Sequence, residues 1–291
     1  MTNNNIIEAR IIKKYSSQFI LLYDNQEFVA TTKSKRTNFV VGDLVQAEIA
    51  ENKQARILDL LPRKSLLFRS DHNRSKLIAS NITQVFIVIS SQPRCNLQFL
   101  NACLIFCESQ YIRPVIVVNK NDLDSHKEFY ENIHSLYHEK LKYQVVSVNA
   151  ICNIDILNQL LEGNSTVLIG QSGVGKSTII SKILSLEIRA GGLSSNGKGC
   201  HTTTSATMYQ IDDYSSIIDS PGLDNFGINQ INPYDLSRCF IDFLPYIPLC
   251  KFRNCLHLNE PECAVLKAFS QDQIDPARYK SYLTFLQIIS T

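Results

Sequence analysis

Residues 170–178 read GQSGVGKST, and this stretch decides the fold of the chain around it. It follows the apolar segment STVLIG and precedes STIISKILSL, in which apolar residues recur at helical spacing. A strand, a Gly-x-x-x-x-Gly-Lys-Ser loop and a helix in that order form a phosphate-binding loop. The glycines let backbone N–H groups turn toward phosphate oxygens, and the positive end of the helix dipole adds attraction. The sequence therefore predicts that a nucleotide is bound by Gly170, Gln171, Ser172, Gly173, Val174, Gly175, Lys176, Ser177 and Thr178.

Individual roles follow from the chemistry of such loops. Lys176 is expected to reach the β and γ phosphates, and the Ser177 hydroxyl is expected to bind Mg²⁺. Further on, the strand-like SSIID ends in DSPG, where Asp219 suits the second carboxylate on the Mg²⁺ side. The N–H of Gly222 would then approach the γ-phosphate.

Between these motifs lies GGLSSNGKGCHTTTSAT, residues 191–207, a stretch typical of a switch that ligand contacts order. One threonine of Thr202–Thr204 should close on Mg²⁺ and the γ-phosphate, and Thr203 is the residue we choose. Leu223 follows DSPG at the position where Ras-type GTPases have a water-orienting Gln, which predicts slow intrinsic hydrolysis. His201 is the nearest group able to act on the attacking water and is the candidate catalytic residue.

A second motif follows the apolar strand PVIVV: Asn119, Lys120, Asn121 and Asp122. A carboxylate such as that of Asp122 accepts both N–H groups on the N1 and N2 edge of guanine, which adenine does not offer, so NKND predicts binding of GTP and GDP. Ser147 and Val148, at the end of another strand, are candidates for contact with guanine O6.

The order of the motifs is unusual, because NKND precedes the phosphate-binding loop by about fifty residues instead of following it. Either NKND is accidental or the domain is circularly permuted. Permutation is well tolerated when the original termini lie close together at the surface. The sequence NKND, SV, GQSGVGKST, HTTT, DSPG is self-consistent for a permuted GTPase domain, and we adopt this interpretation.

Near the C-terminus, Cys250, Cys255, His257 and Cys263 fall within 14 residues. Three thiolates and an imidazole form a closed tetrahedral Zn²⁺ site of the structural kind. The alternative is a group of buried free thiols, which would require chance clustering because the other six cysteines are scattered along the chain. We therefore predict one structural zinc ion.

Composition sets the frame for these motifs. The chain has 291 residues, 44% hydrophobic and 19% charged, which excludes a disordered protein and favours several domains. No apolar run approaches the length of a membrane span, so we expect no membrane segment. Nine cysteines without a secretory signal predict reduced thiols and a cytoplasmic protein.

Three domains are predicted from the pattern along the chain. Short β-like stretches over residues 1–62, with a turn predicted at Asp24-Asn25, suggest a small barrel of the OB type, although an SH3-like barrel would have a similar pattern. Residues 63–231 alternate buried-type strands and helices around the GTPase motifs, and 63–76 is interpreted as a basic linker. Five Val/Ile-rich runs are the predicted strands of a parallel sheet covered on both faces: TQVFIVIS, RPVIVVNK, YQVVSVNA, STVLIG and SSIIDS. Residues 232–291 are predicted to form an α-helical zinc-binding domain, which opens with the helix-like stretch PYDLSRCFIDFL, residues 233–244.

The charge is uneven: residues 1–76 carry 13 Lys and Arg against 8 Asp and Glu, whereas the rest carries 16 against 19. This predicts a polyanionic partner or a merely solvated basic surface. Lys33, Lys35, Arg36 and the segment 63–76 are the candidate RNA contacts.

The permuted motif order, GCHTTT and the late C-x₄-C-x-H-x₅-C pattern together resemble the RsgA (YjeQ) family of bacterial ribosome-assembly GTPases, over nearly the whole chain. The resemblance implies a ribosome-stimulated GTPase that acts in late maturation of the small (30S) ribosomal subunit, binds 16S rRNA through its barrel and zinc domains, and hydrolyses GTP to GDP and phosphate as a switch for release. It also implies that His201 is catalytic, that the cluster above binds zinc, and that the protein is a monomer.

The chain departs from the family pattern at three positions. Ser220 stands where the family usually has Thr, Cys200 replaces a basic residue, and Val148 replaces a small one.

Two other functions remain open at this point. A P-loop ATPase or small-molecule kinase with an accidental NKND would use ATP as readily as GTP. An RNA-binding module with a vestigial GTPase domain would not respond to nucleotide, and the intact Lys176, Ser177 and Asp219 argue against it.

Overall fold

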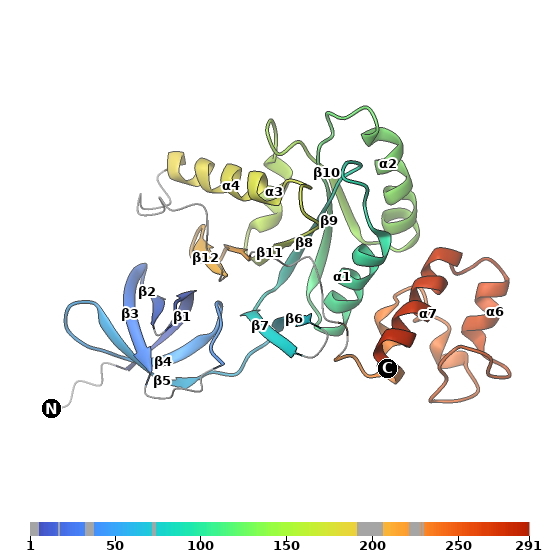
Figure 1. The fold of residues 1–291 in the computed structure, drawn as a ribbon, viewed down its shortest axis with the longest axis horizontal. Helices are drawn as coiled ribbons and strands as arrows, with labels where there is room; N and C mark the ends of the chain where they lie inside the picture. The colour runs from blue at the N-terminus through green and yellow to red at the C-terminus, as the bar shows by residue number, and fades with distance from the viewer. Residues whose placement is uncertain are drawn as a thin grey trace.

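The computed structural model describes residues 6–16, 18–32, 38–71, 74–190, 206–220, 228 and 230–290. Three regions follow one another along the chain: a β-barrel, an α/β region and a small, mainly helical unit (Figure 1). The α/β region lies between the other two, so it touches both.

The N-terminal barrel is built from five strands: β1 (Ile6–Lys14), β2 (Phe19–Tyr23), β3 (Gln26–Thr32), β4 (Leu44–Ile49) and β5 (Gln54–Leu60). Their order is β1-β2-β3-β5-β4, and pairing of β4 with β1 closes the ring. All neighbouring strands are antiparallel except β3 and β5, which are parallel. This closed Greek-key arrangement is the predicted OB-type barrel. The predicted turn at Asp24-Asn25 is also present, with φ values of 47° and 55° that suit a tight hairpin.

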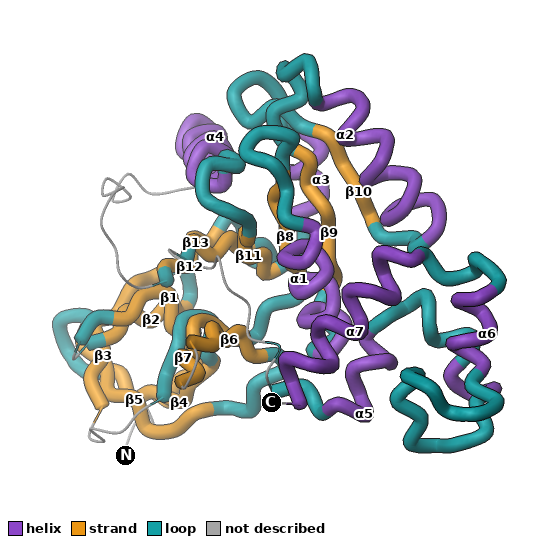
Figure 2. Tube along the Cα trace, turned by 45° about the vertical axis from the view of Figure 1, so that its right-hand side comes forward, coloured by secondary structure: helices purple, strands orange, loops and turns teal. Residues whose placement is uncertain are grey.

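The segment interpreted as a linker contains an antiparallel hairpin, β6 (Leu66–Asp71) and β7 (Arg74–Ser80). The hairpin lies between the barrel and the first long helix, as the ribbon and the tube views both show (Figures 1 and 2). Val41 of the barrel forms a bridge with Ala79, and Phe68 packs edge-to-face against Phe106 of that helix. Its apolar side chains therefore connect the barrel to the α/β region.

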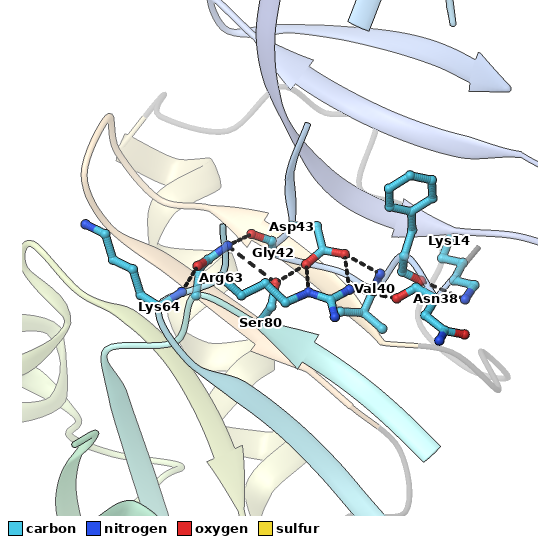
Figure 3. A network of polar contacts seen from close by, with 10 residues as sticks. Lys14, Asn38, Val40, Gly42, Asp43, Arg63, Lys64 and Ser80 are labelled. Carbon is cyan, nitrogen blue, oxygen red and sulfur yellow. Dashed lines mark hydrogen bonds and ion pairs between the residues drawn. The ribbon is translucent and has the colours of Figure 1, made fainter. Parts of the chain in front are cut away.

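A buried ion pair holds this junction (Figure 3). The carboxylate of Asp43 is fully buried, and Arg63 donates to both of its oxygens at 2.7 and 2.8 Å. The Ser80 hydroxyl and the Val40 backbone N–H donate to the same carboxylate at 2.5 and 2.8 Å. Four donors satisfy a charge that would otherwise be costly to bury.

The central sheet contains β8 (Gln84–Ile89), β9 (Arg113–Val118), β10 (Gln144–Ser147), β11 (Ser165–Ile169), β12 (Thr207–Gln210) and β13 (Ser216–Asp219). Their order is β10-β9-β8-β11-β13-β12; the first five are parallel, and β12 is antiparallel to β13. The five parallel strands are the five predicted from their Val/Ile runs. The antiparallel β12 was not predicted, and it also meets β1 where Lys13 pairs with Thr207.

Helices cover both faces of this sheet: α1 (Leu97–Ser109), α2 (His126–Ile133), its π-helical continuation η1 (His134–Lys140), α3 (Asp155–Leu161) and α4 (Lys176–Ala190). Side chains alternate along each strand, so Ile87 packs with α1 and α2 while Val88 packs with α3 and α4. Burial on both faces explains why these strands are apolar at every position.

The C-terminal unit contains α5 (Pro233–Leu236), η3 (Ser237–Cys239), η4 (Ile247–Leu249), α6 (Ala264–Ser270) and α7 (Pro276–Ser290). The helix expected over residues 233–244 is only α5 plus a 3₁₀ turn, because the chain becomes extended at Phe240. That change of direction lets Phe240 and Phe243 both enter the core of the unit. Within the described chain, no helix has the length and apolarity needed to traverse a membrane.

The unit is attached to α1 through a second buried cation. Arg278 on α7 is 1% exposed, donates to Asp242 at 2.9 Å and donates to the Asn101 side chain of α1 at 2.8 Å. The guanidinium carbon also lies 4.5 Å from the centre of the Phe240 ring. The buried guanidinium thus has partners on both sides of the junction.

Candidate functional site

The predicted motifs meet at one edge of the central sheet. NKND directly follows β9, the segment 147–150 ends and follows β10, the loop 170–175 follows β11, and Asp219 ends β13. These four strands are parallel, so their carboxyl ends lie on the same side. In open α/β sheets this is the edge where ligands bind.

The phosphate-binding loop has the backbone that its glycines predict. Gly173 and Gly175 have φ values of +81° and +104°, a region that side chains disfavour. A Cβ on Gly170 would lie 2.2 Å from the carbonyl oxygen of Val88 on the neighbouring strand. The Lys176 ammonium donates to the carbonyls of Gly170 and Gln171 at 2.5 and 2.9 Å. Its positive charge is therefore held within the loop, where it can meet a phosphate.

Asn119 connects NKND with that loop. Its Nδ2 donates to the Val174 carbonyl at 2.9 Å, and its Oδ1 accepts from the Ala150 N–H at 3.0 Å. The side chain is 2% exposed and lies against Gly175, where a Cβ would come within 2.2 Å of Nδ2. One buried amide thus joins three loops that are far apart in the sequence.

Asp122 is held by a residue outside the predicted set. Its Oδ1 accepts from Nδ2 of Asn149 at 3.0 Å. Val148, a predicted contact of guanine O6, donates its N–H to the Val118 carbonyl at 2.9 Å as part of the sheet, and Ser147 is the last residue of β10. The residue of this segment that contacts Asp122 is therefore Asn149, just beyond the predicted pair. Its signal in the sequence was a short polar residue directly after the strand end.

The other residues of NKND contact the loop after β8 and the segment at the end of β10. Lys120 has a φ of +63°, and its ammonium donates to the Gln92 carbonyl at 2.8 Å. The Asn121 N–H donates to the Val148 carbonyl at 3.2 Å. In the loop after β8, the Asn96 N–H donates to Oε1 of Gln171 at 2.8 Å. This hydrogen bond connects the loop after β8 to the phosphate-binding loop. Neither Gln92 nor Asn96 belongs to a motif, so sequence reasoning missed both.

A bound cation would stabilise the ionised carboxylate of Asp219 next to the phosphate-binding loop. Burial raises the pKa of Asp219, and the nearby positive charge of Lys176 partly opposes this effect. Ser177 and Thr178, at the start of α4, are accessible to solvent. A half-buried carboxylate and an accessible hydroxyl near one loop are oxygen donors of the kind that Mg²⁺ prefers.

Several predicted residues lie outside the described part of the chain: His201, Thr203 and its neighbours Thr202 and Thr204, Gly222, Leu223, and the basic residues Lys33, Lys35 and Arg36.

The C-terminal unit brings its four predicted metal ligands together. One donor atom from each of Cys250, Cys255, His257 and Cys263 lies within 4.8 Å of all the others. Nδ1 of His257 is 3.3 Å from Sγ of Cys263 and 3.7 Å from Sγ of Cys250, and these two sulfurs are 3.9 Å apart. Tetrahedral zinc with Zn–S bonds of about 2.3 Å would hold its ligand atoms about 3.5–3.8 Å apart. The cluster therefore has the dimensions of a zinc site.

The surroundings of the cluster support the same fit. Burial, with a contribution from the neighbouring thiols, raises the pKa of Cys255 to about 12, so a cation is needed to stabilise the thiolate. The Leu266 N–H donates to Sγ of Cys263 at 3.4 Å, as expected beside a thiolate ligand. Tyr279 and Tyr282 donate to the backbone carbonyls of His257 and Leu256, both at 2.7 Å. The loop carrying the ligands is thereby attached to α7.

Sequence comparison gives a consistent set of relatives. A protein-family model described as RsgA GTPase matches residues 60–229. A Neisseria meningitidis serogroup C protein called small ribosomal subunit biogenesis GTPase RsgA is 38% identical over 285 residues, which cover 97% of this chain and 91% of that protein. A Nitrosomonas europaea protein with the same name is 36% identical over 281 residues, which cover 95% and 90%.

Solved structures have the same fold. YjeQ from Thermotoga maritima superposes with a TM-score of 0.79 at 24% identity and covers 98% of both chains. YloQ, described as a circularly permuted GTPase, superposes with a TM-score of 0.76 at 24% identity and covers 100% of this chain and 97% of its own. The permuted order inferred from the motifs is thus matched at the level of the fold.

Proposed function

We propose that this chain, which belongs to the RsgA GTPase family, hydrolyses GTP to GDP and phosphate and acts in the biogenesis of the small ribosomal subunit. The observation that carries the proposal is the side chain of Asn119, which links NKND to the phosphate-binding loop at 2.9 Å. That link argues against an accidental NKND, because a chance motif would have no reason to contact the loop. The names of the Neisseria and Nitrosomonas relatives support the biological role.

Guanine would be recognised by Asp122. Its carboxylate would accept the N1–H and N2–H groups of the base, while Asn149 donates to Oδ1 and so orients it. The stem of Lys120, whose ammonium is held by the Gln92 carbonyl, would line one side of the base. Adenine presents an acceptor at N1 and would leave the carboxylate without a donor, so GTP should bind in preference to ATP.

Phosphate binding would use the backbone of residues 170–178 and the ammonium of Lys176. Ser177 and Asp219 are the described residues that would hold Mg²⁺, with Thr203 and Gly222 completing the γ-phosphate side. The ion would neutralise charge on the β and γ phosphates. Lys176 would add a fixed positive charge that stabilises the transition state without reorganisation.

His201 is our candidate for positioning the attacking water. Leu223 has no polar group for this role, so we expect slow turnover by the isolated protein. The proposed stimulus is the small ribosomal subunit, and the GTP and GDP states would differ in their affinity for it.

The Cys250, Cys255, His257 and Cys263 set would hold one structural Zn²⁺. A closed set of four protein ligands leaves no position for a substrate. The ion would stabilise the loop that the tyrosines of α7 anchor.

The binding partner would be 16S rRNA. A monomeric protein would bind it through the barrel and the zinc unit. Burial, and next the positive charge of Lys76, lower the pKa of Lys14; Asp43 opposes this effect, and Arg63 adds to it. Cationic side chains thus gather where the barrel meets the hairpin, as an interface with phosphates requires. Lys33, Lys35, Arg36 and the basic residues of 63–76 would extend this surface.

The test is hydrolysis of GTP and ATP by the purified protein, each with and without isolated small ribosomal subunits. We expect slow turnover that is selective for GTP and rises sharply with the subunits. Equal use of ATP would support the kinase or ATPase alternative, and no response to nucleotide or subunits would support the vestigial-domain alternative.

A substitution makes the guanine assignment specific. Asp122→Asn replaces one acceptor with a donor, so xanthine nucleotides, which have a carbonyl at C2, should bind better than guanine nucleotides. Asp155→Asn, an exposed aspartate on α3, should leave the preference for guanine unchanged and serves as the matched control.

A further inference from the structure

A buried histidine lies between the two loops assigned to the base. His126 is the first residue of α2, four positions after Asp122, and is 7% exposed. Its Nε2 is 2.8 Å from Oγ of Ser147, the last residue of β10. None of the motifs includes this imidazole, and neither the zinc cluster nor the phosphate loop contacts it among the described residues.

The His126–Ser147 contact is one of two side-chain links between the same pair of loops. Asn149, two residues after Ser147, donates to Asp122, four residues before His126, at 3.0 Å. The four residues therefore form a closed circuit of two short stretches of chain and two hydrogen bonds. Oδ1 of Asn149 also accepts from the N–H groups of Ile151 and Cys152 at 3.0 and 3.3 Å, so the amide is oriented within its own turn. The His126–Ser147 contact acts on the end of β10, from which that turn begins.

The surroundings of His126 favour a neutral imidazole ring. Burial lowers the pKa of His126, while the backbone of Asn119 and the carboxylate of Asp122 oppose that effect. Tyr130, one turn further along α2, stacks on the ring at a centroid distance of 5.8 Å and an interplanar angle of 11°. The side-chain hydrogen bond of the ring is the one that Nε2 makes with Ser147.

We propose that His126 is a positioning residue for guanine selectivity: through Ser147 it sets the position of Asn149, which orients the Asp122 carboxylate. This inference rests on the proposed function, because it requires Asp122 to bind the base. His126 itself would not touch the nucleotide. Its removal should therefore weaken recognition of the guanine edge and leave the contacts with the phosphates intact.

The experiment measures dissociation constants of the full-length, zinc-loaded protein for GDP, IDP and ADP. IDP lacks the 2-amino group and makes one of the two hydrogen bonds to Asp122, and ADP makes neither. For His126→Ala we expect GDP affinity to fall about tenfold, IDP affinity to fall less, and ADP affinity to remain unchanged. The ratio of GDP to IDP affinity then shrinks, which a general loss of folding would not produce.

Three further variants keep the test decisive. His126→Gln places an amide nitrogen near the position of Nε2 and should restore much of the ratio in a folded protein. Ser147→Ala should reproduce the effect, and adding it to His126→Ala should cost nothing more, since both remove the same contact. His138→Ala, at an exposed histidine further along the same helical segment, is the control and should leave the ratio unchanged.

The outcomes separate this inference from the proposed function. A wild-type protein that does not prefer GDP to ADP contradicts the assignment of Asp122 itself. A wild-type protein with that preference, combined with an unchanged ratio of GDP to IDP affinity in folded His126→Ala, overturns the role of His126. Additive losses in the double variant also overturn it.

Discussion

Nδ2 of Asn119 donates to the carbonyl of Val174 at 2.9 Å, although 55 residues separate them. The contact joins the segment after β9 to the loop after β11, with β8 between these strands. Motif order along the chain is therefore irrelevant to the geometry of the site, because parallel strands bring all their carboxyl ends to one edge. A circular permutation leaves this edge unchanged.

Gly175→Ala should disrupt this contact. The new Cβ would lie 2.2 Å from Nδ2 of Asn119, and φ at this position is +104°. We expect Asn119 to be displaced and GDP affinity to fall at least about tenfold, since breaking a buried hydrogen bond costs about 1–3 kcal/mol. Isothermal titration with GDP measures the loss.

Gly163→Ala is the control for backbone strain in that experiment. Gly163 also has a positive φ, +70°, but a Cβ added there would meet no atom within 4 Å beyond its chain neighbours, and the residue is remote from the motifs. This variant should lose some stability and keep its GDP affinity. Equal losses of affinity in both variants would argue that strain, and not displacement of Asn119, is responsible.

Arg63→Ala should destabilise the junction between barrel and hairpin. It removes two hydrogen bonds from Asp43, whose side chain is fully buried, and leaving a buried charge without its partner costs about 3–5 kcal/mol. Hydrogen exchange should show faster exchange at the Val40 N–H, which donates to the same carboxylate. Arg56→Ala, on the exposed side of β5, should change stability by less than about 0.5 kcal/mol. Unchanged protection at Val40 in Arg63→Ala would contradict the prediction.

Asp219→Asn should stabilise the nucleotide-free protein at neutral pH while weakening Mg²⁺-dependent GTP binding. Burial raises the pKa of Asp219 above its ordinary value of 3.8, so the folded state holds this proton more tightly than the unfolded state. The ionised carboxylate therefore costs stability, and that cost grows as pH rises from the unfolded pKa through the folded pKa. Thermal unfolding of both proteins across this pH range measures the difference. A gain in stability that does not increase with pH would contradict this assignment.

Cys263→Ser should remove the metal and destabilise the C-terminal unit. Sγ of Cys263 lies 3.3 Å from Nδ1 of His257 and also accepts from the Leu266 N–H at the start of α6. We expect metal analysis to change from one zinc per chain to substantially less, with lower thermal stability. Cys239→Ser, a buried cysteine outside the cluster, should retain the full zinc content. Full zinc content in Cys263→Ser would contradict the four-ligand assignment.

Much of the fold could be predicted from local patterns. The Val/Ile runs predicted the five parallel strands because burial on both faces requires apolar residues at every position, and Asp24-Asn25 predicted a barrel hairpin through its turn geometry. The hairpin β6–β7 was interpreted as a linker because its basic residues hid the apolar positions, including Leu67 and Phe68, that pack inward. The helix after Pro233 was predicted too long because its period continued through Phe240, where packing with Phe243 and Tyr282 reverses the direction of the chain.

The residues of the candidate site also fall into two groups, those that local patterns predict and those that they do not. Lys176, Asp122 and Cys263 could be proposed from the sequence because their chemistry requires a residue type at a set spacing. Asn149, Gln92 and His126 could not, because each contacts a predicted site residue that is distant from it in the sequence.

The sequence by itself determined which chemical groups the protein has: a Gly-rich loop with a lysine, an NKND segment with its carboxylate, and a group of three cysteines and one histidine, each encoded within a few residues. Only the tertiary structure decided how those groups are oriented. Orientation depends on single contacts such as those of Asn119 with Val174, Asn149 with Asp122 and Arg63 with Asp43. Such contacts join segments that become neighbours only when the sheet and the barrel have formed, so no local pattern records them.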